Sequence, residues 1–299
     1  MTPPASLLVS PDPAAPEYVR VTPASAGWNL LHFAARRLRA GQTWPFDTGA
    51  HEFALVVLGG VCAVASSRGE WPRLGRRPHV FAGLPYALYL PRRTTFTLTA
   101  LDDQVDLAYG WCATDQDHPA ALITPAQSPI ELRGGGNASR QINGLLLPGF
   151  DCHRLIVVEV YTPAGNWSSY PPHKHDVHRL SPSGAVLEAD LEEVYFYKFG
   201  RVGAEHDPGA GYAYQQVYTR DGRLNHLLQP RHDDVVLVPE GYHPVAVAPG
   251  YHGYYLNFLA GSAQSLANAD DPALAWVRAN WPPLDPRLPL VSPAQEPDA

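Results

Sequence analysis

The sequence has few cysteines, no long apolar run and no excess of positive charge, and each absence narrows the kind of protein it encodes. Cys62, Cys112 and Cys152 are scattered without the spacing of a metal or redox motif, so we expect reduced thiols, as in the cytoplasm. No stretch approaches the ~18 consecutive apolar residues of a membrane helix. The first residues show no basic segment followed by an apolar one, so we expect no signal peptide and a soluble, cytoplasmic protein.

The net charge limits the kinds of binding partner that we expect. A net charge of −7 argues against nucleic acid or an anionic membrane as the main partner, and leaves room for a small anionic ligand attracted by local charge. What the chain has in quantity is turn-forming residues, with 31 prolines and 25 glycines among 299 residues. Together with 45% hydrophobic and 17% charged residues, this predicts a globular, all-β protein of short strands, in one large or two ordinary domains.

Two histidines in the segment Pro171-Pro172-His173-Lys174-His175 suggest a metal site. On a strand, residues i and i+2 point to the same face, so both imidazoles can reach one ion. The two prolines cannot donate ladder hydrogen bonds, which predicts a strand start or a barrel rim. A lone His-x-His is more often an exposed polar strand, so the hypothesis needs further ligands.

A glutamate and a third histidine supply them. The β-branched and aromatic segment 191–197 predicts a strand on which Glu193 shares a face with two tyrosines, whereas Glu192 shares the other face with Val194 and Phe196. Glu193 is therefore the better candidate ligand. The apolar run 235–238 leads through a Pro-x-Gly turn to His243.

The resulting ligand set is His173, His175, Glu193 and His243. Three imidazoles and one carboxylate suit one divalent ion of Zn, Mn, Fe, Ni or Co, with Zn or Mn favoured, and leave positions open for a substrate. Two histidines on one strand, a glutamate on a neighbour and a histidine after a Pro-x-Gly turn resemble the cupin superfamily. That resemblance implies small β-barrels with a metal near one mouth.

The first half of the chain also predicts strands, at 51–64 with a Gly-Gly turn, 87–90, 95–101 and 105–111. Glu52 precedes its apolar strand in a position resembling that of Glu193, but no His-x-His precedes it and no histidine follows Pro91. We therefore expect a bicupin, with two double-stranded β-helix (jelly-roll) barrels. Residues 1–136 would form a barrel without metal ligands, and residues 137–299 the metal-binding barrel and a poorly ordered tail. Residues 113–145 are expected to connect the barrels.

Longer motifs extend the resemblance from the cupin superfamily to one particular family. The segments 137–141, 158–176, 191–197 and 236–245, above all the run Trp167-Ser168-Ser169-Tyr170-Pro171-Pro172-His173-Lys174-His175-Asp176, resemble the 5-deoxy-glucuronate isomerase family of inositol catabolism. Ala164 and Glu240 depart from it, where we expect Gly and Arg. The resemblance implies metal-dependent conversion of 5-deoxy-D-glucuronate to 2-deoxy-5-keto-D-gluconate, an aldose–ketose isomerisation. The sequence identifies no general base and does not choose between an enediolate route and a hydride shift.

The predicted partner is a small sugar acid, and cations bind its carboxylate through charge-assisted hydrogen bonds. The candidates for that contact are Arg140, Lys174 and Arg179, although alternation predicts that Lys174 points away from the metal. Polar groups expected to line the pocket are Tyr195, Tyr197, Gln216, Tyr242, Tyr255 and Asn257.

Three alternatives stay open. The first is the 4-deoxy-5-keto-uronate ketol-isomerase of pectin breakdown, which the extended Trp-Ser-Ser-Tyr run disfavours. The second is a cupin dioxygenase, which would use iron and an apolar pocket. The third is a non-catalytic sugar-binding or storage cupin, which predicts lost ligands in both halves. By analogy with related cupins, exposed edge strands also make a homo-oligomer an expectation.

Overall fold

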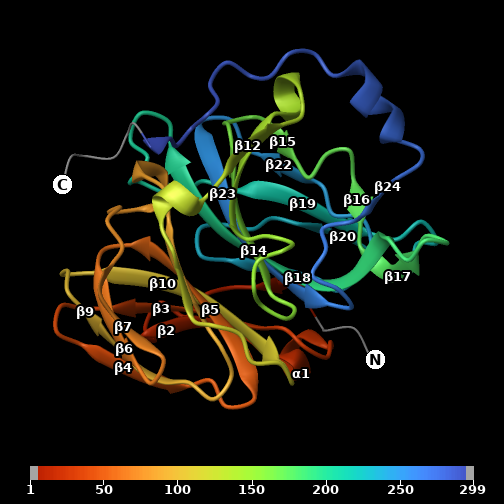
Figure 1. The fold of residues 1–299 in the computed structure, drawn as a ribbon. Coiled ribbons are helices and arrows are strands. Elements are labelled where there is room, and N and C mark those ends of the chain that lie inside the picture. Colours follow the sequence, from red (N-terminus) through yellow and green to blue (C-terminus); the bar gives the residue numbers. More distant parts are fainter. Residues whose placement is uncertain (1–5, 294–299) are drawn as a thin grey trace.

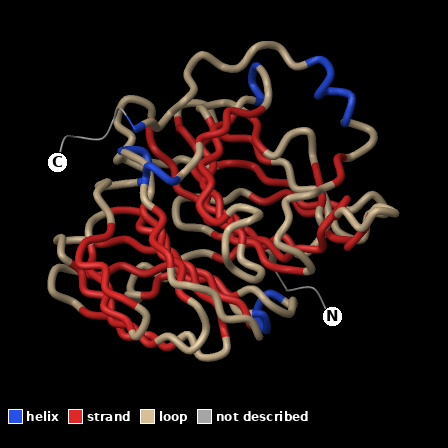
Figure 2. Tube along the Cα trace, viewed as in Figure 1, coloured by secondary structure: helices blue, strands red, loops and turns tan. Residues whose placement is uncertain are grey.

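The computed structural model describes residues 6–293 and consists almost entirely of β-strands arranged in two halves (Figures 1 and 2). In the first half, one sheet contains, in spatial order, β11 (Ala121–Ile123), β8 (Tyr86–Leu90), β5 (His51–Gly59), β10 (Val105–Ala113), β3 (His32–Leu38) and β2 (Glu17–Val21). It packs on a second sheet of β4 (Thr43–Asp47), β9 (Thr95–Ala100), β6 (Cys62–Ser66) and β7 (Gly69–Leu74).

The second half repeats this plan. Its large sheet contains, in spatial order, β1 (Leu8–Val9), β21 (Val235–Val238), β18 (Val186–Arg201), β23 (Tyr251–Gly261), β14 (Ile156–Thr162), β13 (Arg140–Leu146) and β12 (Ile130–Arg133), and β17 (Asp176–Leu180) also pairs with β18. The smaller sheets are β15 (Trp167–Ser168), β22 (Val245–Val247), β19 (Ala213–Tyr218) and β20 (Asn225–Leu228), and β16 (His173–Lys174) with β24 (Ala269–Asp270). The predicted all-β architecture is confirmed.

Helices are short. They are α1 (Pro23–Ala26) and the 3₁₀ segments Val80–Ala82, Pro125–Gln127, Gly136–Ala138 and Ala275–Asn280. None of the helices within residues 6–293 has the length and apolar character needed to cross a membrane. The three cysteines are buried free thiols, as predicted.

Along each strand of the large sheets, alternate side chains point into the barrel interior or toward the large sheet of the other half. On β18, Glu193, Tyr195 and Tyr197 face the interior of the second barrel, whereas Val194 and Phe196 pack against the first half. The ring centroids of Phe33 on β3 and Phe196 lie 5.5 Å apart across this contact. The two large sheets therefore pack against each other through a shared hydrophobic core.

A glycine allows the two sheets to approach closely. A Cβ added at Gly110 on β10 would lie 2.4 Å from the ring of Phe258 on β23. Any larger residue at position 110 would push the two large sheets apart, because Phe258 is fully buried in their shared core.

The expected connection at residues 113–145 is wrong in part. It contains β11, β12 and part of β13, and β12 and β13 belong to the large sheet of the second half. β13 is rich in polar residues and glycine, which made it look like a loop, but its buried Gln141 and Asn143 bond to each other at 2.9 Å. A boundary between residues 136 and 137 stays a prediction.

The C-terminal segment also differs from expectation. Val291 is buried, and its carbonyl accepts a 2.7 Å hydrogen bond from Nε2 of Gln141. Backbone amides of Leu290 and Val291 donate in turn to Oε1 of Gln141. The prediction of a poorly ordered tail is therefore wrong as far as residue 293, and residues 294–299 lie outside the described part.

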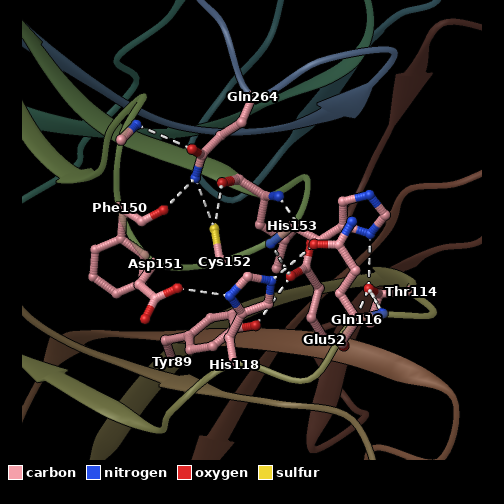
Figure 3. Close-up of polar contacts among 12 residues, drawn as sticks. Glu52, Tyr89, Thr114, Gln116, His118, Phe150, Asp151, Cys152, His153 and Gln264 are labelled. Carbon is pink, nitrogen blue, oxygen red and sulfur yellow. Dashed lines mark hydrogen bonds and ion pairs between the residues drawn. The ribbon is translucent and has the colours of Figure 1, made fainter.

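Glu52 has a different role from the one its position suggested (Figure 3). Its fully buried carboxylate faces the other half and accepts backbone N–H bonds from His153, Arg154 and Leu155 at 2.8, 2.7 and 3.0 Å, together with a 3.0 Å bond from the Tyr89 hydroxyl. Glu52 therefore joins the two halves and does not point into its own barrel, as a counterpart of Glu193 would.

Candidate metal centre

Three buried side chains converge inside the second barrel. The ligand atoms of His175, Glu193 and His243 all lie within 4.8 Å of one another. Nε2 of His175 lies 2.9 Å from Oε2 of Glu193, and Nε2 of His243 lies 3.4 Å from the same oxygen. The three residues come from the segment after β16, from β18 and from the turn after β21.

The turn before His243 needs its glycine. Gly241 has φ of +87°, and a Cβ there would lie 2.4 Å from the carbonyl oxygen of Tyr218. The Pro-x-Gly pattern in the sequence therefore marks a backbone position that only glycine fills without strain.

Backbone carbonyls orient two of the imidazoles. Nδ1 of His175 lies 3.2 Å from the carbonyl of Leu191, and Nδ1 of His243 lies 2.9 Å from that of Gly241. Each Nδ1–H donates to its carbonyl, which directs Nε2 of each ring into the cluster. Nε2 of His243 is buried without a hydrogen-bond partner, which costs about 1–3 kcal/mol unless an ion satisfies it. The donor set and this orphaned nitrogen fit a divalent metal.

The pKa values of His173 and His243 support the same assignment. Burial and the neighbouring His175 lower the pKa of His243 to about 3. Burial, with His243 and His175, also holds the pKa of His173 well below its usual value. Both imidazoles are neutral at pH 7, which is the form that binds metals. Burial raises the pKa of Glu193 despite its bond from His175.

His173 lies beside this cluster. Its ring centroid is 4.8 Å from that of His243 and 6.3 Å from that of His175. Its strand β16 pairs with β24, which fixes the segment at the mouth of the barrel. The structure thus brings three of the four predicted ligands together and places the fourth next to them, so its role as a ligand stays a prediction.

The cluster opens into a cavity of about 260 Å³. Its polar lining includes His173, His175, Glu193, Tyr195, Tyr255, Asn257, Ser169, Asn268, Arg140, Arg133 and Glu131, and its apolar lining includes Ile142, Leu147, Val158, Val160, Leu259 and Leu266. Such a lining can hold a small polar molecule with one end at the cluster.

Two serines hold the cavity's tyrosine hydroxyls. Oγ of Ser169 lies 3.0 Å from the Tyr195 hydroxyl and 3.4 Å from that of Tyr255, and Oγ of Ser168 lies 2.6 Å from the latter. Ser169 adopts φ of +50°, which is unusual for serine and directs its side chain to this position. Burial raises the pKa of both phenols, so both stay protonated at neutral pH.

Arg140 on β13 is the buried cationic group of the cavity, whereas the side chain of Arg133 is 40% exposed. It is 3% exposed, and its Nη1 donates to the carbonyls of Ala138 and Tyr170 at 3.3 and 3.0 Å. It has no carboxylate partner among the described residues. Burial lowers its pKa to about 10, and Arg133 adds to this effect. A buried guanidinium without a counter-ion is well suited to bind an anionic group of a ligand.

The other two predicted cations lie outside the cavity lining. Lys174 points away from the cluster, as alternation predicted, and its Nζ pairs with Asp176 and, at 2.6 Å, with Glu188. Arg179 has a side chain that is 55% exposed and lies 3.7 Å from Glu188. Neither position supports the predicted contact with a substrate carboxylate.

Three of the predicted pocket residues also lie outside it. Tyr197 is fully buried deeper in the barrel and donates to Gln215 at 2.8 Å. Gln216 points outward and bonds to Asn225, and Tyr242 packs on Tyr218. The predicted pocket residues that reach the cavity are thus Arg140, Tyr195, Tyr255 and Asn257.

Sequence reasoning missed several lining residues. Arg133 and Ile142 were overlooked because their segment was interpreted as a connection, and Leu266 and Asn268 because they precede the short strand β24 in an irregular stretch. Ser169 lies in the Trp-Ser-Ser-Tyr run that carried the family resemblance, and that run was the only signal for its role.

Comparison with known proteins identifies the family of this chain. The model of the KduI/IolB family matches residues 7–277. The chain belongs to the KduI/IolB family. It is 40% identical over 260 residues to a 5-deoxy-glucuronate isomerase of Geobacillus thermodenitrificans, which covers 87% of this chain and 90% of that protein. It is 34% identical to the protein of the same name from Bacillus subtilis, over 86% of this chain and 91% of that one.

Solved structures confirm the fold of this KduI/IolB member. An IolB-like protein from Salmonella typhimurium superposes with a TM-score of 0.84 at 33% identity, covering 91% of this chain and 99% of that one. An oxalate decarboxylase from Lactobacillus farciminis superposes with a TM-score of 0.57 at 10% identity, over 88% of each chain. The second likeness bears on the fold alone, and it agrees with the predicted two-barrel cupin architecture.

Proposed function

We propose that this protein is a metal-dependent isomerase that converts 5-deoxy-D-glucuronate to 2-deoxy-5-keto-D-gluconate in inositol catabolism. Relatives at 40% and 34% identity carry the name 5-deoxy-glucuronate isomerase. One observation in the structure carries the proposal: the unpaired guanidinium of Arg140 lines the same cavity as His175 and Glu193. An acidic sugar with a carbonyl at its other end matches that arrangement.

His175, Glu193 and His243 would hold one divalent metal, with His173 as a fourth ligand. Imidazole and carboxylate donors suit several divalent metals, and Zn or Mn is favoured among them. When bound, such an ion supplies Lewis-acid polarisation of the carbonyl and hydroxyl oxygens at C1 and C2 of the sugar.

Arg140 would bind the C6 carboxylate and so orient the chain of the substrate. Fixing one end of a flexible sugar places its reactive end at a defined position and removes much of the entropic cost of the reaction. The guanidinium already has its backbone contacts, so it needs little rearrangement to receive the anion.

Tyr195 and Tyr255 would donate hydrogen bonds to hydroxyl oxygens of the sugar. Their raised pKa values keep both phenols protonated, and the two serines hold the hydroxyls in place.

Incubation of the purified, metal-loaded protein with 5-deoxy-D-glucuronate tests the proposal, with product formation followed by NMR in D₂O. Appearance of the ketose supports it, and deuterium at C1 indicates proton transfer through solvent-exchanging groups. Preferential turnover of the 4-deoxy-5-keto-uronate would assign the protein to the sister reaction of pectin breakdown. Oxygen uptake would instead indicate a dioxygenase.

A further inference from the structure

We infer that Lys174 is a positioning residue of the metal centre, and that it acts through Asp176 to hold the turn that carries His243. The inference rests on the metal centre of the proposed function and does not depend on which sugar acid that centre converts. Lys174 lies between His173 and His175 in the sequence, but its side chain points away from the cluster and lies outside the cavity lining.

Lys174 is the centre of a small charge cluster behind the ligands. Its ammonium group pairs with the carboxylate of Asp176 and, at 2.6 Å, with that of Glu188. The side chains of Lys174, Asp176 and Glu188 are 21%, 15% and 4% exposed. Arg179 also approaches Glu188, at 3.7 Å, but its side chain is 55% exposed. Lys174 is therefore the half-buried cation that holds two poorly solvated carboxylates together.

The second oxygen of Asp176 connects this cluster to a metal ligand. Oδ2 of Asp176 accepts a hydrogen bond from the backbone N–H of Gly241 at 2.9 Å. The carbonyl of Gly241 accepts in turn from Nδ1–H of His243, also at 2.9 Å. A continuous path of polar contacts therefore runs from the ammonium group through Asp176 and Gly241 to the imidazole of His243.

The charge cluster also joins the segments that supply the ligands. Lys174 and Asp176 belong to the segment with two of the histidines, and Glu188 belongs to β18, the strand with the carboxylate ligand. Gly241 belongs to the turn that leads to the third histidine. Because these segments are far apart in the sequence, the distances between their ligands depend on tertiary contacts. The charge cluster supplies such contacts on the side of the segments that faces away from the cavity.

Loss of the ammonium group should weaken metal binding. Without Lys174, the carboxylates of Asp176 and Glu188 would repel each other at a place where little water screens them. Asp176 would then turn toward solvent and release the N–H of Gly241, so the turn would no longer hold His243 in one orientation. Removal of a hydrogen-bonding partner behind a metal ligand typically lowers metal affinity by about 10–100-fold.

The test measures the Zn²⁺ dissociation constant of the full-length protein, stripped of metal, by competition with a chelating dye. We expect Lys174→Met to raise this constant by about 10–100-fold, and Lys174→Arg, which keeps the charge, to recover most of the affinity. Lys198→Met is the matched control, because the only other lysine of the sequence also bridges two carboxylates, those of Asp106 and Asp233. The control should bind Zn²⁺ as tightly as the wild type, although it also loses a buried ion pair.

A double-mutant cycle tests the route through Asp176. If Lys174 acts through Asp176, the Asp176→Ala variant should bind Zn²⁺ at least as weakly as Lys174→Met, and the double variant should lose no more affinity than Asp176→Ala alone. Additive losses would contradict this route. The visible spectrum of bound Co²⁺ reports the coordination geometry, so it should change in Lys174→Met and stay as in the wild type in Lys198→Met.

An unchanged Zn²⁺ dissociation constant in a folded Lys174→Met protein overturns the inference and leaves the metal centre intact. Lys174→Gln gives the same comparison if Lys174→Met does not fold. A raised KM for 5-deoxy-D-glucuronate in the metal-loaded variant, with unchanged Zn²⁺ affinity, would place Lys174 at the substrate and also overturn the inference. Failure of the wild-type protein to bind Zn²⁺ or Mn²⁺ contradicts the proposed function and the inference together. Metal binding without turnover of this acid contradicts the proposed function alone.

Discussion

Glu52 and Glu192 occupy equivalent positions in the two halves, and each accepts hydrogen bonds from three consecutive backbone N–H groups of the other half. Glu52 on β5 accepts from residues 153–155, immediately before β14, at 2.7 to 3.0 Å. Glu192 on β18 accepts from residues 29–31, immediately before β3, at 2.6 to 2.9 Å. The two barrels are therefore joined by a reciprocal pair of carboxylates related by the internal repeat.

This equivalence supports the prediction that the first barrel has no metal ligands. If Glu52 corresponds to Glu192, the next residue, Phe53, corresponds to the ligand Glu193. Phe53 packs in a cluster with Trp44, Phe96 and Tyr109 inside the first barrel. Aromatic rings thus fill the space in which the second barrel gathers its ligands.

Replacing Glu52 by glutamine should destabilise the protein without affecting the metal cluster. The substitution removes the charge that strengthens three backbone hydrogen bonds and places an amide NH₂ near N–H donors. We expect the free energy of unfolding to fall by about 2–4 kcal/mol in urea denaturation, with metal content retained. An unchanged unfolding midpoint would show that these bonds contribute nothing to the joining of the halves.

Replacing Arg140 by methionine should reduce kcat/KM for 5-deoxy-D-glucuronate. Loss of a charge-assisted pair with the substrate carboxylate costs about 2–4 kcal/mol, which corresponds to roughly 30- to 1,000-fold. Arg179→Met is the control, because that arginine is exposed and lies outside the cavity. Equal losses in the two variants, measured by steady-state kinetics with the metal content verified, would contradict the assignment of Arg140.

Acid should destabilise the contact between the two halves through His232. Burial and the nearby Lys198 lower the pKa of His232 to about 4, and its Nδ1 accepts a hydrogen bond from the backbone N–H of Phe199. Because the unfolded value is about 6.5, the contribution to stability is complete above that pH and is lost as the pH falls toward 4. Between pH 7 and 5 the wild type should lose up to about 2 kcal/mol more than His232→Asn, measured by urea denaturation. Parallel pH profiles of the two proteins would be inconsistent with this prediction.

The sequence predicted those parts of the fold and site that depend on local pattern. Alternation along residues 191–197 separated Glu193 from Glu192, and the Pro-x-Gly turn located His243; both residues lie where this reasoning placed them. The strand at 235–238 has the bounds its apolar run predicted. These features were accessible because neighbouring residues alone determine them.

Other features depend on contacts between distant segments. The polar residues Gln141 and Asn143 made β13 look like a loop. In the structure they bond to each other, and Gln141 also bonds to the backbone of residue 291, which is far along the chain. Lys174, Arg179 and Gln216 were chosen for their charge or polarity, but pairing with Asp176, Glu188 and Asn225 holds them outside the cavity. Tertiary packing decides which of several polar side chains reaches a cavity, and no local sequence pattern indicates it.

Metal content of Glu193→Gln compared with Glu192→Gln tests the central claim most directly. The two residues are adjacent on β18, but one carboxylate lies 2.9 Å from His175 and the other binds backbone amides of residues 29–31. After loading with Zn or Mn and removal of excess ion, elemental analysis should show that Glu192→Gln retains about one metal per chain. Glu193→Gln should lose most of its metal while staying folded, because a neutral amide is a poor replacement for a carboxylate ligand. Full metal content in a folded Glu193→Gln protein, or loss of metal from Glu192→Gln, would contradict the proposed centre.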